Sequence, residues 1–99
     1  MIKQPCVYIL ASKPNGTLYI GVTSNLIQRI HQHKNNLIDG FTTKYQVYSL
    51  VYVELYNTMH EAIHREKCMK EWKREWKIKR IKQTNPNWND LYEDYAKSI

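Results

Sequence analysis

The chain has 99 residues and a formal net charge of +6, which suits a single domain with an acidic partner, most simply nucleic acid. No apolar run approaches the roughly 20 residues of a membrane span, so we expect no membrane association. The two cysteines lack zinc-ligand spacing and are too few for a disulfide framework; because no signal peptide opens the sequence either, we expect a cytoplasmic location.

Residues 6–22 are typical of a β-hairpin. Residues 6–10 are β-branched and aromatic, residues 13–16 have turn chemistry, and residues 17–22 form the returning strand. Antiparallel pairing can place Tyr8 and Tyr19 side by side on one face. The register stays open, because the connecting loop can have four to six residues.

A short helix follows, indicated by the spacing of Leu26, Ile27 and Ile30 after a hydroxyl N-cap at position 23 or 24. At about 100° per residue, Arg29 and His33 project from one edge of this helix, one turn apart. A guanidinium and an imidazole beside a strand tyrosine can handle a phosphate and a proton.

The second half of the chain predicts one more strand and two helices. Residues 35–43 read as a polar loop, and the apolar run 46–55 predicts a central strand covered on both faces. A long helix is expected over 58–75, with Thr58 as N-cap, and another over 77–83. The expected apolar arc of the long helix comprises Met59, Ala62, Ile63, Met69, Trp72 and Trp76.

These elements predict a single α+β domain over residues 1–99, with a three-stranded, mainly antiparallel sheet flanked by helices. The tail, from about residue 85, carries apolar residues that can pack back on the body. They are Trp88, Leu91, Tyr92 and Tyr95.

Glu66 breaks the apolar pattern of the long helix, because it projects between Ala62 and Ile63 on the inward side. A carboxylate there costs several kcal/mol unless a cation meets it. Two interpretations stay open: a buried ion pair, for example with Arg29, or a metal-binding acid.

Together these residues resemble the GIY-YIG nuclease signature. Cys6-Val7-Tyr8 is followed by the run Tyr-Ile-Gly-x-Thr-x-Asn-Leu-x-x-Arg-x-x-x-His over residues 19–33, and Glu66 comes later. The family includes the nuclease domain of the bacterial excision-repair incision subunit. The chain is most similar to its small stand-alone bacterial members, over essentially its whole length.

The resemblance implies hydrolysis of a DNA phosphodiester with one divalent cation, Mg²⁺ or Mn²⁺. By position, Glu66 is the metal ligand and Arg29 offsets charge in the transition state. A tyrosine, with Tyr8 preferred, takes a proton from the attacking water with help from His33, and Tyr19 holds the water or the phosphate.

Three positions depart from the family pattern. Cys6-Val7 replaces the first glycine and isoleucine, and Val22 stands where some members have an activating lysine. The downstream family asparagine has its best match at Asn85, although its distance from Glu66 differs.

A basic run over residues 67–82 holds eight basic and two acidic residues. A charge run is usually a solvated helix face, but this one has the sign that suits contact with a DNA backbone.

Residues 43–45 can line a substrate groove or form a plain loop. Trp72 and Trp76 are expected in the core, and Trp88 suits either core packing or base stacking. The predicted nucleic-acid contacts are Lys44, Lys70, Arg74, Lys77 and Asn85.

Two other functions compete with a structure-directed DNA endonuclease of repair or processing. The first is a nucleic-acid-binding module with weak or lost catalysis, and charge alone does not distinguish RNA from DNA. The second is a zinc peptidase, because His60, Glu61 and His64 match the H-E-x-x-H pattern. We rank it far behind, since both histidines lie away from the apolar arc and no third ligand follows.

Overall fold

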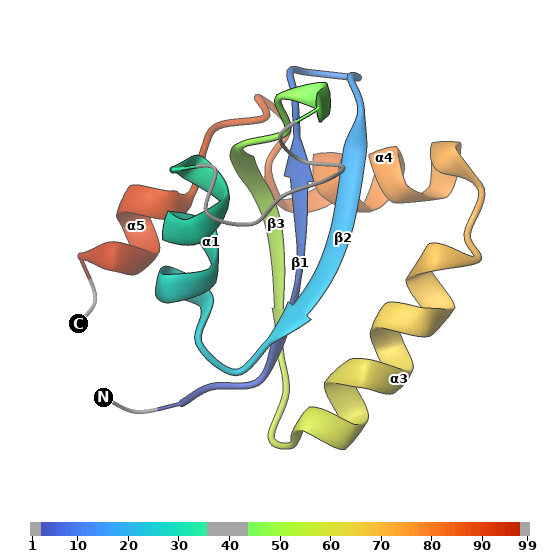
Figure 1. Cartoon of the computed structure of the whole chain (residues 1–99). Coiled ribbons are helices and arrows are strands. Elements are labelled where there is room, and N and C mark those ends of the chain that lie inside the picture. The colour runs from blue at the N-terminus through green and yellow to red at the C-terminus, as the bar shows by residue number, and fades with distance from the viewer. Residues whose placement is uncertain (1–2, 36–43, 98–99) are drawn as a thin grey trace.

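The computed structural model describes residues 3–35 and 44–97. Its described strands form an antiparallel sheet of three, with α1 and α5 on one face and α3 and α4 on the other (Figure 1). The predicted α+β class is thereby confirmed. No helix in these ranges is long and apolar enough to cross a bilayer. In chain order the elements are β1 (Cys6–Ala11), β2 (Leu18–Thr23), α1 (Leu26–Lys34), β3 (Ser49–Leu55), α3 (Met59–Lys70), α4 (Arg74–Thr84) and α5 (Tyr92–Ala96).

The strand order β2-β1-β3 places β1 at the centre of the described sheet. All six residues of Cys6–Ala11 are buried, because β1 has a strand on each side and helices over each face. The prediction that residues 46–55 form the central strand is therefore wrong. That strand, β3, pairs with β1 alone and begins later, at Ser49. Gln46 has a φ of 55°, a left-handed conformation that does not extend a strand.

The sheet separates two apolar clusters. Val7 and Ile9 belong to the cluster under α3 and α4, whereas Tyr8 and Leu10 belong to the cluster under α1 and α5. Because alternate strand residues point to opposite faces, β1 contributes to both clusters. This alternation directs Tyr8 toward α1.

The N-cap of α1 is Asn25, whose side chain accepts a hydrogen bond from the Gln28 backbone N–H. The prediction of a hydroxyl cap at position 23 or 24 is therefore wrong. The Thr23 hydroxyl instead accepts from the Asn25 N–H at 3.0 Å and shapes the turn before the helix.

The predicted long helix over residues 58–75 is two helices. α3 begins after Thr58, whose hydroxyl caps it as predicted, but ends at Lys70, and α4 begins at Arg74. Trp72, in the turn between them, packs against the cluster under α3 and α4. The helix expected over 77–83 is the later part of α4.

The break changes which side chains reach the core. Trp76 now lies on α4 and is 52% exposed, and Ile63 on α3 is 38% exposed. The prediction that both belong to an apolar core arc is therefore wrong, whereas Ala62 and Met69 are buried as predicted.

The segment after α4 lies against the body. Trp88 is 8% exposed in the cluster under α3 and α4. The Asp90 carboxylate accepts hydrogen bonds from the Leu50 N–H at 3.1 Å and from Lys34 Nζ at 2.5 Å. These bonds connect the segment to both β3 and α1.

Candidate active site

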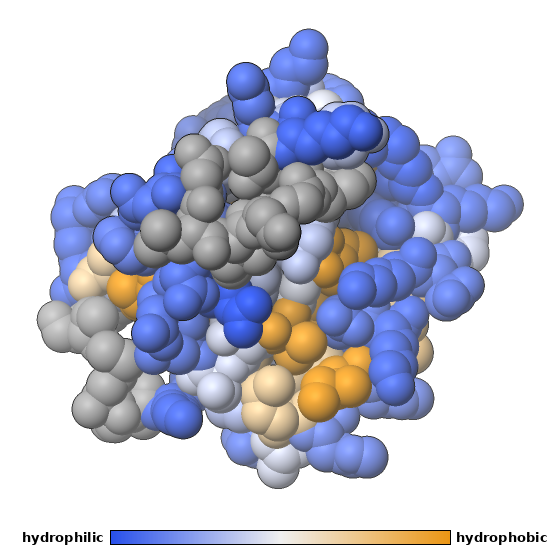
Figure 2. All heavy atoms as spheres, in the orientation of Figure 1, coloured by the Kyte–Doolittle hydropathy of each residue, from blue (hydrophilic) through white to orange (hydrophobic). Residues whose placement is uncertain are grey.

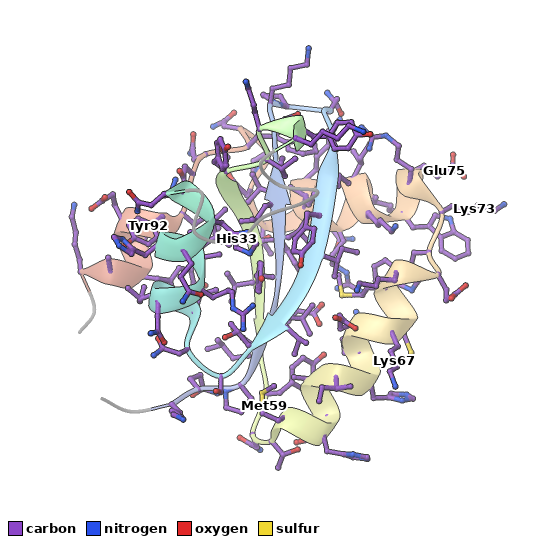
Figure 3. All side chains as sticks on the ribbon, viewed as in Figure 1. His33, Met59, Lys67, Lys73, Glu75 and Tyr92 are labelled. Carbon is purple, nitrogen blue, oxygen red and sulfur yellow. The ribbon has the colours of Figure 1, made fainter. Side chains whose placement is uncertain are left out.

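Tyr8, Tyr19 and His33 come together from three elements, β1, β2 and α1. The register pairs Tyr8 with Gly21 and Leu10 with Tyr19, so the two tyrosines are diagonal neighbours on one face, as predicted. Their ring centroids lie 6.3 Å apart, and the His33 ring lies 5.9 Å from Tyr8 and 5.4 Å from Tyr19. Figure 3 shows His33 extending from α1 toward the strands.

A hydrogen bond of 3.1 Å joins the Tyr8 hydroxyl to His33 Nε2, and both residues are 1% exposed. Burial, followed by the effect of Tyr19, raises the pKa of the Tyr8 phenol above its ordinary value of 10. Burial and the charge of Arg29 lower the pKa of His33 below its ordinary value of 6.5. At neutral pH both groups are therefore neutral, and the phenol donates to Nε2 in the tautomer that carries the imidazole proton on Nδ1.

Arg29 and Glu66 both act electrostatically on Tyr8, Arg29 lowering and Glu66 raising its pKa. Glu66 comes from α3, on the other face of the sheet, and α3 packs against the edge strand β2. Its side chain is 15% exposed and forms an ion pair with Lys70 at 3.3 Å. Among the described residues, the cation that pairs with Glu66 is Lys70, and not Arg29, the example given for the ion-pair interpretation.

A hollow of about 290 Å³ opens beside Tyr19, lined by Leu18, Tyr19, Ile20, Lys70 and Lys77. Figure 2 shows an apolar patch on this face with hydrophilic surfaces on either side. The site is layered, because Tyr19 borders the hollow whereas Tyr8 and His33 are buried. Two predicted phosphate contacts, Lys70 and Lys77, lie at this hollow.

The other predicted nucleic-acid contacts lie elsewhere. Arg74 donates to the backbone oxygens of Asn15 and Gly16, at 2.6 and 2.5 Å, and so fixes α4 to the β1–β2 turn. Lys44 is exposed, with its ammonium 5.4 Å from the Tyr45 ring. The remainder of the predicted groove-lining loop, including residue 43, lies outside the described residues.

Asn85 is 4% exposed, and its side-chain amide donates to the backbone oxygens of Val51 and Asn89 at 3.1 and 2.8 Å. Its side-chain oxygen accepts from the Asn89 N–H at 3.0 Å. Both ends of the amide are engaged, which argues against the predicted contact with nucleic acid. Asn85 instead joins the end of α4 to β3.

The three residues of the H-E-x-x-H pattern that could ligate or react, His60, Glu61 and His64, are exposed on α3. Glu61 is committed to the helix start: its N–H donates to the Thr58 hydroxyl, which donates in turn to the Glu61 carboxylate. The part of the chain that the structure describes contains no group of three or more side chains able to hold a metal. This geometry does not favour a zinc peptidase.

Gly21 is a site residue that the sequence alone does not identify. A Cβ built on Gly21 would lie 2.3 Å from both the Cζ and the hydroxyl oxygen of Tyr8. The Tyr8 ring therefore lies directly over the glycine of its partner strand. Once the register is known, the pairing of Tyr8 with Gly21 indicates that the residue at position 21 must lack a Cβ.

The depressed pKa of His33 predicts a pH-dependent stability. The unfolded chain binds a proton at His33 near pH 6.5 that the folded chain does not bind, so the free energy of unfolding should decrease as the pH falls through 6.5. Replacing His33 with glutamine should flatten this dependence, measured by urea unfolding between pH 5 and pH 8. His31→Gln is the matched control, because His31 is exposed on the same helix. Equal flattening in both variants would contradict the prediction.

The fold and this cluster define a class of small α+β domain, in which two tyrosines of a hairpin meet a histidine of the following helix. The chain belongs to the GIY-YIG family, because residues 4–85 match the GIY-YIG catalytic domain. The predicted family is therefore confirmed.

Relatives in several bacteria match over most of their length. A UPF0213 protein of Streptococcus agalactiae is 31% identical over 83 residues, which cover 84% of this chain and 94% of that protein. A UPF0213 protein of Staphylococcus saprophyticus is 34% identical over 77 residues, which cover 78% of this chain and 93% of that protein. The solution NMR structure of a UPF0213 protein from Bacillus halodurans shares the fold, with a TM-score of 0.55 at 23% identity, covering 89% of this chain and 93% of that one.

Proposed function

We propose that this protein is an endonuclease that hydrolyses DNA phosphodiester bonds with one divalent metal ion. Membership of the GIY-YIG family supports nuclease chemistry. The observation that carries the proposal is the hydrogen bond between the buried Tyr8 phenol and a neutral His33, with the Tyr19 ring beside both. This pair provides a route by which a proton can leave an attacking water.

The Glu66 carboxylate fits one magnesium or manganese ion. Magnesium is commonly held by one or two carboxylates, with water and substrate phosphate completing its shell. Lys70 pairs with Glu66 at 3.3 Å, so its ammonium would have to leave the carboxylate when the ion binds, which would free it for a phosphate. When bound, the ion would polarise the phosphate and stabilise the leaving oxygen.

The proton route follows from the 3.1 Å hydrogen bond between Tyr8 and His33. A water that enters along Tyr19 and meets the Tyr8 hydroxyl loses a proton to that oxygen, while Tyr8 passes its own proton to His33 Nε2. The resulting hydroxide bonds to phosphorus while the bond from phosphorus to the leaving ester oxygen breaks. That oxygen takes a proton from water, and His33, now an imidazolium, releases its proton to solvent. A free Tyr8 phenolate does not have to form in this route. This matters because burial raises the pKa of the Tyr8 phenol.

Arg29 supplies charge stabilisation in this scheme. Its guanidinium acts on both Tyr8 and His33 and can donate two hydrogen bonds to phosphate oxygens. Lys70 and Lys77 at the hollow would hold the backbone on either side. Because phosphate contacts carry no base information, cleavage should depend on DNA structure rather than sequence, as in repair or processing.

The test is a cleavage panel over plasmid, duplex, flap, junction and single-stranded DNA with magnesium or manganese. Wild type should cut at least one substrate, and Arg29→Ala should lower the rate by about 100- to 1,000-fold. Lys13→Ala is the control, because Lys13 is an exposed cation in the hairpin turn and should retain activity. Binding without cleavage of any substrate would instead favour the nucleic-acid-binding module, and cutting RNA alone would change the substrate class.

A further inference from the structure

A second hollow, of about 370 Å³, lies along α4. Three of its lining residues follow Trp76 on the helix at positions i+3, i+4 and i+7, which is the spacing of one helix face. Trp72, from the turn before α4, supplies another wall. We call this surface the Trp76 groove; its lining residues are Trp72, Trp76, Lys79, Arg80 and Gln83.

The two tryptophans of the groove differ in how they are held. Two guanidinium groups lie near the Trp72 ring, that of Arg65 4.7 Å and that of Arg80 5.7 Å from the ring centroid. Arg65 is itself fixed by Glu54, which accepts from its Nε at 2.9 Å and its Nη2 at 3.1 Å. This wall of the groove is therefore built before any ligand arrives.

Trp76 is 52% exposed, and the Lys73 ammonium lies 5.8 Å from its ring centroid. Burying a tryptophan is among the larger apolar gains available to a fold, so a half-exposed indole beside cations is not explained by core packing. Its free area suits a flat, π-rich ligand.

The charge of the groove is positive. Its lining includes the cations Lys79 and Arg80 and no acidic residue. An adjoining hollow of about 420 Å³ shares Lys79 and adds Lys82, against one acid, Glu75. In the described part of the chain, none of these three cations forms an ion pair within 4.0 Å.

The groove is distinct from the hollow beside Tyr19. Lys77, on α4, lines that hollow, whereas Lys79 and Arg80 line the Trp76 groove. Positions 77 and 79 are about 200° apart around a helix, so α4 presents a different cationic side chain to each surface. A nucleic-acid strand bound at the hollow beside Tyr19 can continue around α4 toward the Trp76 groove.

We propose that the Trp76 groove binds unpaired nucleotides of a single-stranded nucleic acid, with a base on the Trp76 ring and the flanking phosphates at Lys79 and Arg80. Stacking on an aromatic ring beside a basic track is how proteins hold single strands without reading sequence. The inference rests on the proposed function only in taking nucleic acid as the partner, since binding here needs no catalysis. It implies that the preferred substrate has a single-stranded arm.

The test measures binding of a fluorescein-labelled ten-nucleotide oligothymidylate by anisotropy, in EDTA, so that cleavage plays no part. Trp76→Ala should weaken binding about tenfold, and Trp76→Tyr should restore most of it because a ring returns. Lys79→Ala should also weaken binding and reduce the slope of log affinity against log salt by about 0.7. Circular dichroism and thermal unfolding establish that each variant is folded.

Lys13→Ala is the matched control, because it removes one exposed cation that lines neither hollow. It should leave oligothymidylate affinity within about twofold. Oligothymidylate should also quench tryptophan fluorescence, and Trp76→Tyr should remove most of that quenching. Three results would overturn the proposal. Trp76→Ala could keep wild-type affinity, Lys79→Ala and Lys13→Ala could lose affinity equally, or polyglutamate of the same charge could compete as well as oligothymidylate. Oligothymidylate binding by a protein that cuts nothing would overturn the proposed function alone.

Discussion

Replacing Glu66 with glutamine should lower metal-dependent DNA cleavage by more than about a hundredfold while leaving DNA affinity unchanged. Loss of a residue that merely supports a metal ligand typically costs about 10- to 100-fold, and Glu66 is proposed as the protein's own ligand. Glutamine keeps the shape and removes the charge. Cleavage rates are measured over a magnesium titration, and affinity is measured in EDTA.

Glu61→Gln is the matched control for this experiment. Glu61 is also on α3, and its replacement changes net charge by the same amount, but its carboxylate belongs to the helix cap, where glutamine serves as well. Its cleavage rate should equal that of wild type. Because Glu61 would be the catalytic base of a zinc peptidase, the same variant tests that function. Full activity in Glu66→Gln would exclude Glu66 as the metal ligand.

The parts of the fold that the sequence predicts correctly depend on local signals. A turn between two β-branched segments is enough for the β1–β2 hairpin, and Thr58 marks the start of α3 through the hydroxyl that caps it. The most specific part of the family resemblance is similarly a continuous run, residues 19–33, which lies in β2, the turn after it and α1. Such signals require no knowledge of which elements later pack together.

The errors concern features that only tertiary packing decides. A continuous apolar run marks a strand as buried, but it does not distinguish β1 at the centre from β3 beside it, since β3 contributes to both clusters. Helical periodicity continues through residues 71–73, where the chain instead turns so that Trp72 packs on the core near Arg65 and Arg80. That turn is why Trp76 is exposed.

The candidate site shows the same division. The motif identifies Tyr8, Tyr19 and His33 by their chain positions. It does not predict how deeply each is buried, because the burial of Tyr8 depends on the sheet and α1 together. Chain position is the sole basis for matching Asn85 to the downstream family asparagine. Its burial between α4 and β3 gives it a structural role.

Replacing Gly21 with alanine should lower cleavage by about a hundredfold or more, although residue 21 carries no reactive group. A Cβ there would lie 2.3 Å from the Tyr8 hydroxyl oxygen and Cζ, so the ring has to move. The ring is held by a 3.1 Å hydrogen bond to His33, and a displacement of about 1 Å in a catalytic group can cost about 100-fold in rate. Overpacking should also lower stability by about 1–3 kcal/mol. Cleavage rate per folded molecule and urea unfolding measure the two effects.

Gly16→Ala separates loss of catalysis from loss of stability. A Cβ at Gly16 would meet the side chains of Ser12 and Lys13 at 2.4 and 2.7 Å, in the hairpin turn. Gly16→Ala should therefore destabilise the protein and retain activity per folded molecule. In a Tyr8→Ala background, Gly21→Ala should cost less stability than in wild type, because the ring it displaces is gone. Unchanged cleavage in Gly21→Ala, or the same stability cost in both backgrounds, would show that the position of the Tyr8 ring does not depend on Gly21.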